Sequence, residues 1–409
     1  RLTLGGAPTM RACHICRVAR VEEILDCGPQ PISNRFLASP SDDEYTHPMV
    51  MGQCDHCGLV QIIDPVPAGE LLAPYDWISY REPEGHLDDL TDLIASLPGV
   101  DHNSTVCGIT FKDDSTLTRL EARGLGHSWR IDPQADLGIT DDRAGTETVQ
   151  AKLTRDQAIQ IATSRGKSDV VVGRHILEHA HDTSGFMEAI GELVAPGGYV
   201  VFEVPDCGRA LDNFDYSCPW EEHVLYFTEQ TFRNCVLPER FSAVRFESYP
   251  YPSENALVGI LCAQPEEVPP GPPPKVLNEE RRRWESYSTG LSTCQVKLRS
   301  ALLECRTKRG QVALFGAGHL ACTYINLLGV ADLVECVVDD NPNKRGLLMP
   351  GSQLPIYESA RLTQGNIKLC LLCLSPESED IVIKNNRGFV DQGGTFASIF
   401  PASKRALKL

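Results

Sequence analysis

The sequence predicts an α/β protein in three parts: a small N-terminal zinc module, a Rossmann-like core and a second, C-terminal Rossmann-like domain. Three observations predict this class. Two Cys-x-x-Cys pairs lie within the first 57 residues, as in zinc knuckles. Residues 101–263 and 312–400 each alternate short apolar runs with amphipathic segments, which is typical of parallel sheets covered by helices on both faces. Residues 264–275 contain six prolines, and this composition predicts a stiff linker between the two units.

The pairs Cys13-His-Ile-Cys16 and Cys54-Asp-His-Cys57 are separated by 37 residues. Each pair presents two sulfur atoms from one tight turn, and two facing pairs form the tetrahedral thiolate set that suits Zn²⁺. We therefore predict a zinc site with Cys13, Cys16, Cys54 and Cys57 as ligands. Four thiolates leave no open coordination position, so the predicted role of the ion is structural.

Other residues near these motifs have alternative interpretations. His14 and His56 lie inside the two pairs and are alternative ligands. Cys370-Leu-Leu-Cys373 has the same spacing, but it lies in a continuous apolar run. Alternate faces of a strand would separate those two sulfur atoms, so we expect them in the core. Around the knuckles, residues 1–70 are rich in turn-forming residues, and we expect few strands there.

The alternating units predict their elements in order. We expect a helix at 86–97 within a connector, a helix at 183–194, and a charged helix at roughly 277–307 after the linker. The predicted strands are 104–111, 127–132, 169–174, 198–204, 243–249, 256–263, 312–315, 333–340, 368–375 and 395–400. The predicted domains are a zinc module at 1–70, a core with its helical connector at 71–263, a Pro-rich linker at 264–276, and a helix plus Rossmann-like domain at 277–409.

The composition narrows the possible partners. Lys and Arg total 38 and Asp and Glu total 55, so the formal net charge is −17, which disfavours nucleic acids and anionic membranes as partners. No apolar run reaches the roughly 20 residues that span a bilayer. Sixteen cysteines in a chain of this length do not resemble a short secreted disulfide scaffold, so we expect a cytoplasmic protein with a small-molecule substrate. The oligomeric state is left open.

Three motifs together carry a family resemblance. They are Gln30-Pro-Ile-Ser-Asn-Arg-Phe36, Trp220-Glu-Glu-His-Val-Leu-Tyr-Phe227, and Asp339-Asp-Asn-Pro-Asn-Lys-Arg-Gly346 followed by Pro350-Gly351 and Leu354-Pro-Ile356. Their order resembles that of the S-adenosylmethionine (SAM)-dependent sugar C-methyltransferases across nearly the whole chain. The resemblance implies a class I methyltransferase-like core. It also implies removal of a proton next to a carbonyl group of a nucleotide-linked keto sugar, and methyl transfer to the resulting enolate.

The resemblance assigns SAM to the core, where the cofactor motif is altered. Asp132 ends a predicted strand and would hold the ribose hydroxyl groups. Arg174 and His175 follow the next core strand, in a stretch that is similar to the D-x-V…H-x-L-E-H segment of such enzymes. The first turn reads Gly-Ile-Thr-Phe-Lys-Asp-Asp over 108–114, with Thr110 facing the cofactor, where the family has a glycine-rich turn. This departure leaves an altered SAM pose, weak binding and no binding as alternatives.

The same resemblance suggests catalytic residues. His223 matches the general base, with Glu222 beside it, and His179 would orient or stabilise the substrate. Trp220 and Trp77 occupy positions where the family has tyrosines, and an indole offers only one N–H donor. We expect both tryptophans in the substrate site. The alternatives are structural histidines and packing aromatics.

The C-terminal domain opens with a Gly-x-Gly-x-x-Ala turn. Gly316 and Gly318 lie between a strand and a helix, Asp339 ends the next strand, and Lys344 is a nearby cation. Three interpretations compete: a seat for the nucleotide of the substrate, a bound nicotinamide cofactor (NAD), and a purely structural domain. The corresponding alternatives to methyl transfer are an NAD-linked oxidoreductase, a SAM-independent isomerase and a non-catalytic binding protein.

Overall fold

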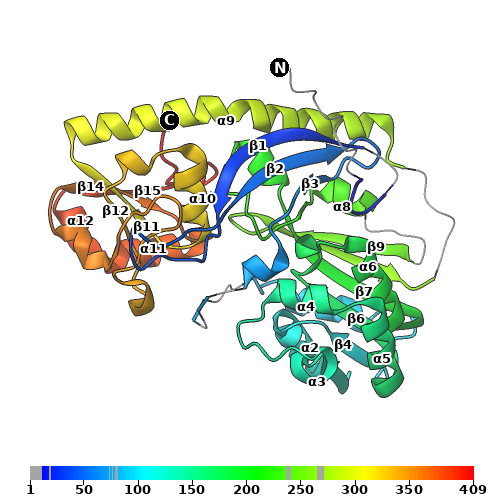
Figure 1. Ribbon diagram of the computed structural model, residues 1–409. Helices are drawn as coiled ribbons and strands as arrows, with labels where there is room; N and C mark the ends of the chain where they lie inside the picture. The colour runs from blue at the N-terminus through cyan, green and yellow to red at the C-terminus, as the bar shows by residue number, and fades with distance from the viewer. Residues whose placement is uncertain are drawn as a thin grey trace.

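The computed structural model describes residues 12–17, 20–72, 74–75, 77–78, 82–235, 241–264 and 271–409. Its strands form three sheets, one for each predicted part of the chain (Figure 1). In Figure 1 the long helix α9 (Pro274–Lys308) runs along the top of the molecule, above the N-terminal strands and the C-terminal domain. No helix in the described part of the chain is long and apolar enough to cross a bilayer.

The N-terminal part is an antiparallel sheet in the order β1-β2-β3-β8. Its strands are β1 (Val21–Pro31), β2 (Thr46–Cys54), β3 (Val60–Ile62) and β8 (Leu225–Tyr226), and η1 (Ala68–Leu71) follows. The expectation of few strands in residues 1–70 is therefore wrong. The pairing of β1 with β2 has two register shifts, and exposed Glu22 and Glu23 are adjacent, so the alternation that marks a strand is interrupted.

The middle domain contains a six-stranded sheet in the order β5-β4-β6-β7-β10-β9, and its first four strands are parallel. The strands are β4 (Thr105–Gly108), β5 (His127–Arg130), β6 (Ser168–Arg174), β7 (Val194–Asp206), β9 (Ser242–Tyr249) and β10 (Asn255–Cys262). The helices and 3-10 turns are α1 (Leu87–Ala95), η2 (Phe111–Asp113), α2 (Asp114–Ala122), α3 (Pro133–Leu137), α4 (Thr146–Lys152), α5 (Arg155–Arg165), η3 (Leu177–His179), α6 (Thr183–Leu193), α7 (Gly208–Asn213) and α8 (Glu229–Cys235). Apolar clusters cover both faces of this sheet, so the predicted α/β class of this domain is confirmed.

The C-terminal domain is a fully parallel sheet in the order β13-β12-β11-β14-β15. The strands are β11 (Gln311–Phe315), β12 (Cys336–Val338), β13 (Ile356–Tyr357), β14 (Ile367–Leu372) and β15 (Thr395–Ser398). The helices and turns are α10 (His319–Leu328), η4 (Ala331–Leu333), η5 (Pro342–Lys344), η6 (Ser359–Thr363), α11 (Pro376–Asn385) and α12 (Arg387–Asp391). Cys370 and Cys373 are buried in two different apolar clusters, as expected for core residues on opposite faces.

Helix α9 joins the N-terminal sheet to the C-terminal domain. Its 35 residues extend over about 52 Å at 1.5 Å per residue. Trp284 packs edge to face against Tyr226 of β8, and Leu298 and Leu302 belong to the same apolar cluster as β11. Residues 265–270 of the predicted linker lie outside the described residues, and α9 begins three residues before the predicted start of the helix. The domain boundaries remain a prediction.

Candidate functional site

The four predicted zinc ligands lie together. The Sγ atoms of Cys13, Cys16, Cys54 and Cys57 are all within 4.8 Å of one another. The separation is 3.7 Å between Cys13 and Cys57 and 3.5 Å between Cys16 and Cys54. Ligands at a Zn–S distance of about 2.3 Å stand about 3.8 Å apart at the corners of a tetrahedron, so this donor set fits Zn²⁺.

The backbone N–H groups of the two histidines inside the knuckles donate hydrogen bonds in the described structure. The N–H of His14 donates to Oε1 of Gln61 at 2.9 Å, and the N–H of His56 donates to Sγ of Cys54 at 3.4 Å. The second contact is typical of a knuckle turn around a thiolate ligand. The geometry therefore supports the four-cysteine set over the histidine alternatives.

Three predicted cofactor residues follow neighbouring strands. Thr110 comes after β4, Asp132 comes after β5 and Arg174 ends β6, so all three lie at the carboxyl edge of the parallel strands. Ligands of doubly wound folds bind at this edge. Asp132 is exposed, and its Oδ1 accepts hydrogen bonds from the N–H groups of Gln134 and Ala135 at 2.9 and 2.7 Å. Asp132 therefore caps α3 with one oxygen.

The altered turn after β4 is closed by one of its own side chains. The carboxylate of Asp113 accepts hydrogen bonds from the backbone N–H groups of Ile109, Thr110 and Arg174 at 2.8, 2.9 and 2.8 Å. Burial raises the pKa of Asp113 to about 6, although these donors oppose the increase. Asp113 thus takes the backbone donors that a glycine-rich turn would present to a ligand.

A buried ionic network lies beside this turn. The carboxylate of Glu203 contacts Nε of Arg174 at 2.7 Å, Nε2 of His175 at 2.9 Å and Nε2 of His86 at 3.0 Å. The guanidinium of Arg174 also donates to two backbone carbonyl oxygens, so its donors are held by the protein. The described contacts of Arg174, a predicted cofactor residue, are therefore all with protein groups. His175, the other predicted cofactor residue here, lines the cavity described below.

We expect this network to make stability depend on pH in the alkaline range. Burial opposes the charge on His175, but the carboxylates of Glu82, Glu178 and Glu203 raise its pKa to about 10, above the usual 6.5. The stabilisation is therefore fully present below about pH 6.5 and is lost as the pH rises through about 10. The difference in Tm between the native protein and a His175→Asn variant should narrow from about pH 7 to pH 10. A constant difference would contradict this role.

A cavity of about 430 Å³, the central cavity, lies between the middle and C-terminal domains. Four carboxyl side chains line it: Glu82, Asp215, Glu254 and Glu377. Burial raises the pKa of Glu254 to about 8, and the nearby charge of Glu82 adds to this increase. At pH 7 Glu254 is therefore mostly neutral and His175 is charged, so Glu82, Asp215 and Glu377 leave a small negative surplus, which suits a cationic ligand better than an anionic one.

His223 is the predicted base, and its side chain lines the central cavity. Burial, His179 and Lys112 hold the pKa of His223 well below its usual range. The ring is therefore neutral at pH 7, and one of its nitrogen atoms has a lone pair that can accept a proton.

The other two predicted catalytic residues, His179 and Glu222, lie behind His223 and do not line the central cavity. The rings of His179 and His223 meet edge to face with centroids 4.9 Å apart, and Nδ1 of His179 pairs with Oε1 of Glu147 at 2.7 Å. Glu222 accepts a hydrogen bond from Nδ2 of Asn34 at 3.1 Å. Burial, with Glu147 nearby, raises the pKa of Glu222 well above its usual range. These contacts suit a role in which His179 and Glu222 position other side chains and do not contact the substrate.

Trp220 contacts two imidazole rings in the wall of the central cavity. Its ring centroid lies 4.7 Å from that of His223, and it stacks on His319 at 4.2 Å with an interplanar angle of 19°. The indole Nε1–H donates to Oγ of Ser33 at 3.1 Å. The single N–H donor of Trp220 is therefore bonded to the N-terminal part, and Trp220 lines the cavity with its aromatic ring.

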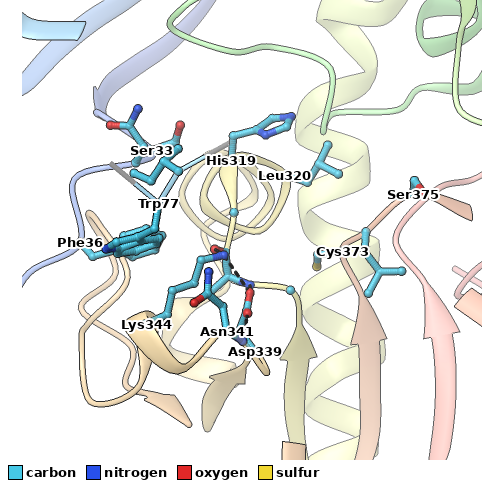
Figure 2. A pocket seen from close by; sticks show the side chains of 16 residues that line it. Ser33, Phe36, Trp77, His319, Leu320, Asp339, Asn341, Lys344, Cys373 and Ser375 are labelled. Carbon is cyan, nitrogen blue, oxygen red and sulfur yellow. Dashed lines mark hydrogen bonds and ion pairs between the residues drawn. The ribbon is translucent and has the colours of Figure 1, made fainter. Parts of the chain in front are cut away.

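A second cavity, of about 390 Å³, lies where the N-terminal part meets the turn before α10 (Figure 2). Phe36 and Trp77 stack with centroids 6.0 Å apart, and Figure 2 shows this pair beside Lys344. Gly316 has φ 101°, and a Cβ there would lie 2.7 Å from the carbonyl oxygen of Cys373, so the turn requires glycine.

Asp339, the acidic residue that follows β12, accepts hydrogen bonds from neighbouring groups of the protein. Oδ2 of Asp339 accepts hydrogen bonds from the N–H of Ala317 at 2.8 Å and from Nζ of Lys344 at 2.9 Å. Nζ of Lys344 also donates to the carbonyl of Ala317 at 2.7 Å, which leaves one of its three N–H groups for a ligand. In an NAD site this carboxylate would hold ribose hydroxyl groups. The arrangement gives the predicted nicotinamide cofactor no support.

The predicted residues gather around two cavities rather than one. His175, Trp220 and His223 line the central cavity, Trp77, Gly316, Gly318 and Lys344 line the second cavity, and Thr110 and Asp132 line neither. Sequence reasoning missed Glu82, Glu147, Glu254 and His319. Of these, His319 alone carried a signal, because it directly follows the second glycine of the Gly-x-Gly-x-x-Ala turn.

Three family models match successive parts of the chain. A zinc binding domain model matches residues 13–71, a methyltransferase domain model matches residues 112–237, and a C-methyltransferase C-terminal domain model matches residues 276–401. The middle match begins inside the altered turn after β4.

Two curated proteins and one solved structure are similar to this chain. The chain is 22% identical over 408 residues to C-methyltransferase NovU from Streptomyces niveus, which is 95% of each chain. It is 28% identical over 142 residues to a ubiquinone biosynthesis O-methyltransferase from Brucella anthropi, covering 31% of this chain and 56% of that one. A solved structure of 1,6-didemethyltoxoflavin-N1-methyltransferase from Burkholderia thailandensis aligns at 11% identity, with 58% of this chain and 99% of that chain covered and a TM-score of 0.31.

Proposed function

We propose that this chain, which is 22% identical to a C-methyltransferase over 95% of its length, transfers a methyl group from SAM to a carbon atom of a nucleotide-linked keto sugar. The observation that carries the proposal is a neutral histidine, His223, in an acidic cavity between the methyltransferase domain and the C-terminal domain. A base in that position can remove a proton from a carbon next to a carbonyl group.

The acidic lining of the central cavity supports a cationic cofactor. Glu82 lines the cavity and pairs with Lys112 of the altered turn at 2.8 Å, so the cavity adjoins the carboxyl edge of the sheet. The exposed Asp132 at that edge, which caps α3 through Oδ1, would hold the ribose hydroxyl groups of the cofactor, whereas Thr110 is buried and bonded to Asp113. When bound, SAM supplies an electrophilic methyl group, which the carbanion carbon of the substrate would take with release of S-adenosylhomocysteine.

The chain's own residues would generate that carbanion. His223 would accept the proton at the ring nitrogen that faces the cavity. His179 supports the His223 ring edge to face, and Glu147 holds His179 through its Nδ1. Glu222 adds a contact to Asn34 of the N-terminal part, so the segment that carries the base is held from two sides. The wall formed by Trp220 would keep water from the substrate carbon.

The second cavity would hold the nucleotide. Lys344 and the backbone at the start of α10 offer cationic and N–H contacts to a diphosphate, and Phe36 and Trp77 offer an aromatic surface to a base. His319, Leu320 and Ser375 line both cavities, so one ligand can occupy the two. Under this proposal the C-terminal domain seats the nucleotide while the sugar reaches His223.

We expect Lys344→Gln to weaken the binding of uridine or thymidine diphosphate about fivefold to tenfold, because the variant loses one charge-assisted contact worth about 1 kcal/mol. Titration calorimetry measures the change. Arg345→Gln is the matched control: Arg345 is the next residue, exposed and ion-paired with Glu358. Equal losses in the two variants would place the diphosphate elsewhere.

The proposed function is tested with the full chain, methyl-labelled SAM and a panel of nucleoside diphosphate 4-keto sugars. The expected product carries a new carbon-bound methyl group, which NMR identifies. Transfer of the label to oxygen or nitrogen would overturn C-methylation. Failure to bind SAM or S-adenosylhomocysteine in calorimetry would overturn the cofactor assignment, and binding without transfer to any of these sugars would overturn the substrate class.

A further inference from the structure

His319 is the first residue of α10 and lies at the junction of the two cavities. Its side chain lines both, and its ring stacks on Trp220 with 4.2 Å between centroids. Figure 2 shows the imidazole at the end of α10, directed away from Lys344. A ligand that places its nucleotide in the second cavity and its sugar in the central cavity would pass this ring.

The same indole group also contacts the ring of His223. Trp220 thus holds two imidazoles in one cavity wall, with its centroid 4.7 Å from that of His223. Burial lowers the pKa of His319 to about 4, so this ring is neutral at pH 7, like His223. Each neutral imidazole has one N–H donor and one acceptor nitrogen. The pair can therefore serve as one base and one donor within the same cavity.

Formation of an enolate requires both functions, because negative charge develops on the carbonyl oxygen as the proton leaves the neighbouring carbon. Trp220 does not meet the second requirement, since its N–H donates to Ser33. His319 lies at the N-terminal end of the ten-residue helix α10, where the helix dipole favours negative charge. A neutral imidazole at a helix N-terminus is a suitable electrophile for a carbonyl group.

We propose that His319 is a catalytic residue that donates a hydrogen bond from its neutral ring to the carbonyl oxygen of the substrate while His223 takes the proton. The proposal rests on the proposed function. In this step the C–H bond breaks, and its electron pair forms the C=C bond of the enolate. The carbonyl π electrons move to oxygen, the proton goes to His223, and His319 keeps its own proton in the hydrogen bond.

Exchange of the substrate α-proton in deuterium oxide, followed by NMR on the 4-keto sugar panel, isolates this step from methyl transfer. His319→Phe preserves a flat ring against Trp220 without the donor, and His319→Gln keeps an N–H donor without the ring. We expect His319→Phe to slow both exchange and kcat by about 10²-fold to 10³-fold, the usual effect of removing one oxyanion donor. His319→Gln should recover at least tenfold of this loss, and the affinity for nucleoside diphosphate should stay within about twofold in both variants.

The outcomes separate the two proposals. Exchange in His319→Phe within about threefold of the native rate would overturn the role of His319 and leave the proposed function intact. An equal loss in the Phe and Gln variants would also overturn it, because packing and not the donor would then explain the effect. A native protein that shows no exchange with any keto sugar would overturn the proposed function and this inference together.

Discussion

Replacing His223 by alanine should lower kcat by about 10³-fold, because the central cavity then has no base next to the substrate carbon. The ring is neutral at pH 7 since burial, His179 and Lys112 depress its pKa, so the native enzyme needs no prior loss of a proton. We therefore expect a native rate that is nearly constant from about pH 6 to pH 8. Turnover and α-proton exchange should both fail in the variant.

Two controls make this result specific. His102→Ala replaces an exposed histidine far from the cavity lining and should leave kcat unchanged. His179→Ala removes the edge-to-face support of His223, and we expect a smaller loss, of about tenfold, because the base itself remains. If His223→Ala retains a tenth or more of the native kcat, His223 is not the base.

Replacing Cys54 by serine should remove zinc and destabilise the whole chain, not only its N-terminal part. A structural zinc site of this type contributes roughly 10 kcal/mol or more to folding, and the loss of one thiolate sacrifices much of it. The sheet that carries the knuckles also contains β8, which begins two residues after His223. We expect zinc content to drop well below one ion per chain, Tm to fall by roughly 10 °C or more, and kcat to fall with them.

Cys294→Ser is the matched control, because this partly buried cysteine on α9 lies outside the ligand set. Its zinc content and Tm should stay near those of the native protein. Metal analysis by mass spectrometry and calorimetry give both quantities. A Cys54→Ser protein that keeps one zinc ion per chain with unchanged Tm would contradict the assigned ligands.

The sequence predicted features that depend on local spacing. The two Cys-x-x-Cys pairs predicted the cluster of four sulfur atoms because each turn holds its sulfur atoms in a fixed relation, and the alternation of apolar runs identified every strand of the two Rossmann-like sheets except the two-residue β13. The core positions of Cys370 and Cys373 followed from the two-residue period of a strand.

The composition of the candidate site depended on contacts between distant segments. Ser33 and Asn34 bond to Glu221 and Glu222, which lie 188 residues further along the chain, and no local pattern reports such a contact. The closure of the altered turn was hidden only in part, because Thr110-Phe-Lys-Asp113 has the spacing of a capping box, whereas the contact of Asp113 with the N–H of Arg174 spans 61 residues. Charged residues along β1 concealed that strand, since they interrupt the alternation.

The strand β8 has a consequence for protein engineering. Its two residues pair with β3, and the neighbouring Val224 donates to the carbonyl of Glu178 and accepts from the N–H of Ile62. The N-terminal part and the segment that carries His223 are therefore joined by backbone hydrogen bonds. A chimaera that replaced the N-terminal part alone would exchange the strand that pairs with β8. A productive exchange of substrate preference between relatives should therefore transfer residues 220–227, which include β8, together with the first 70 residues, α9 and the C-terminal domain.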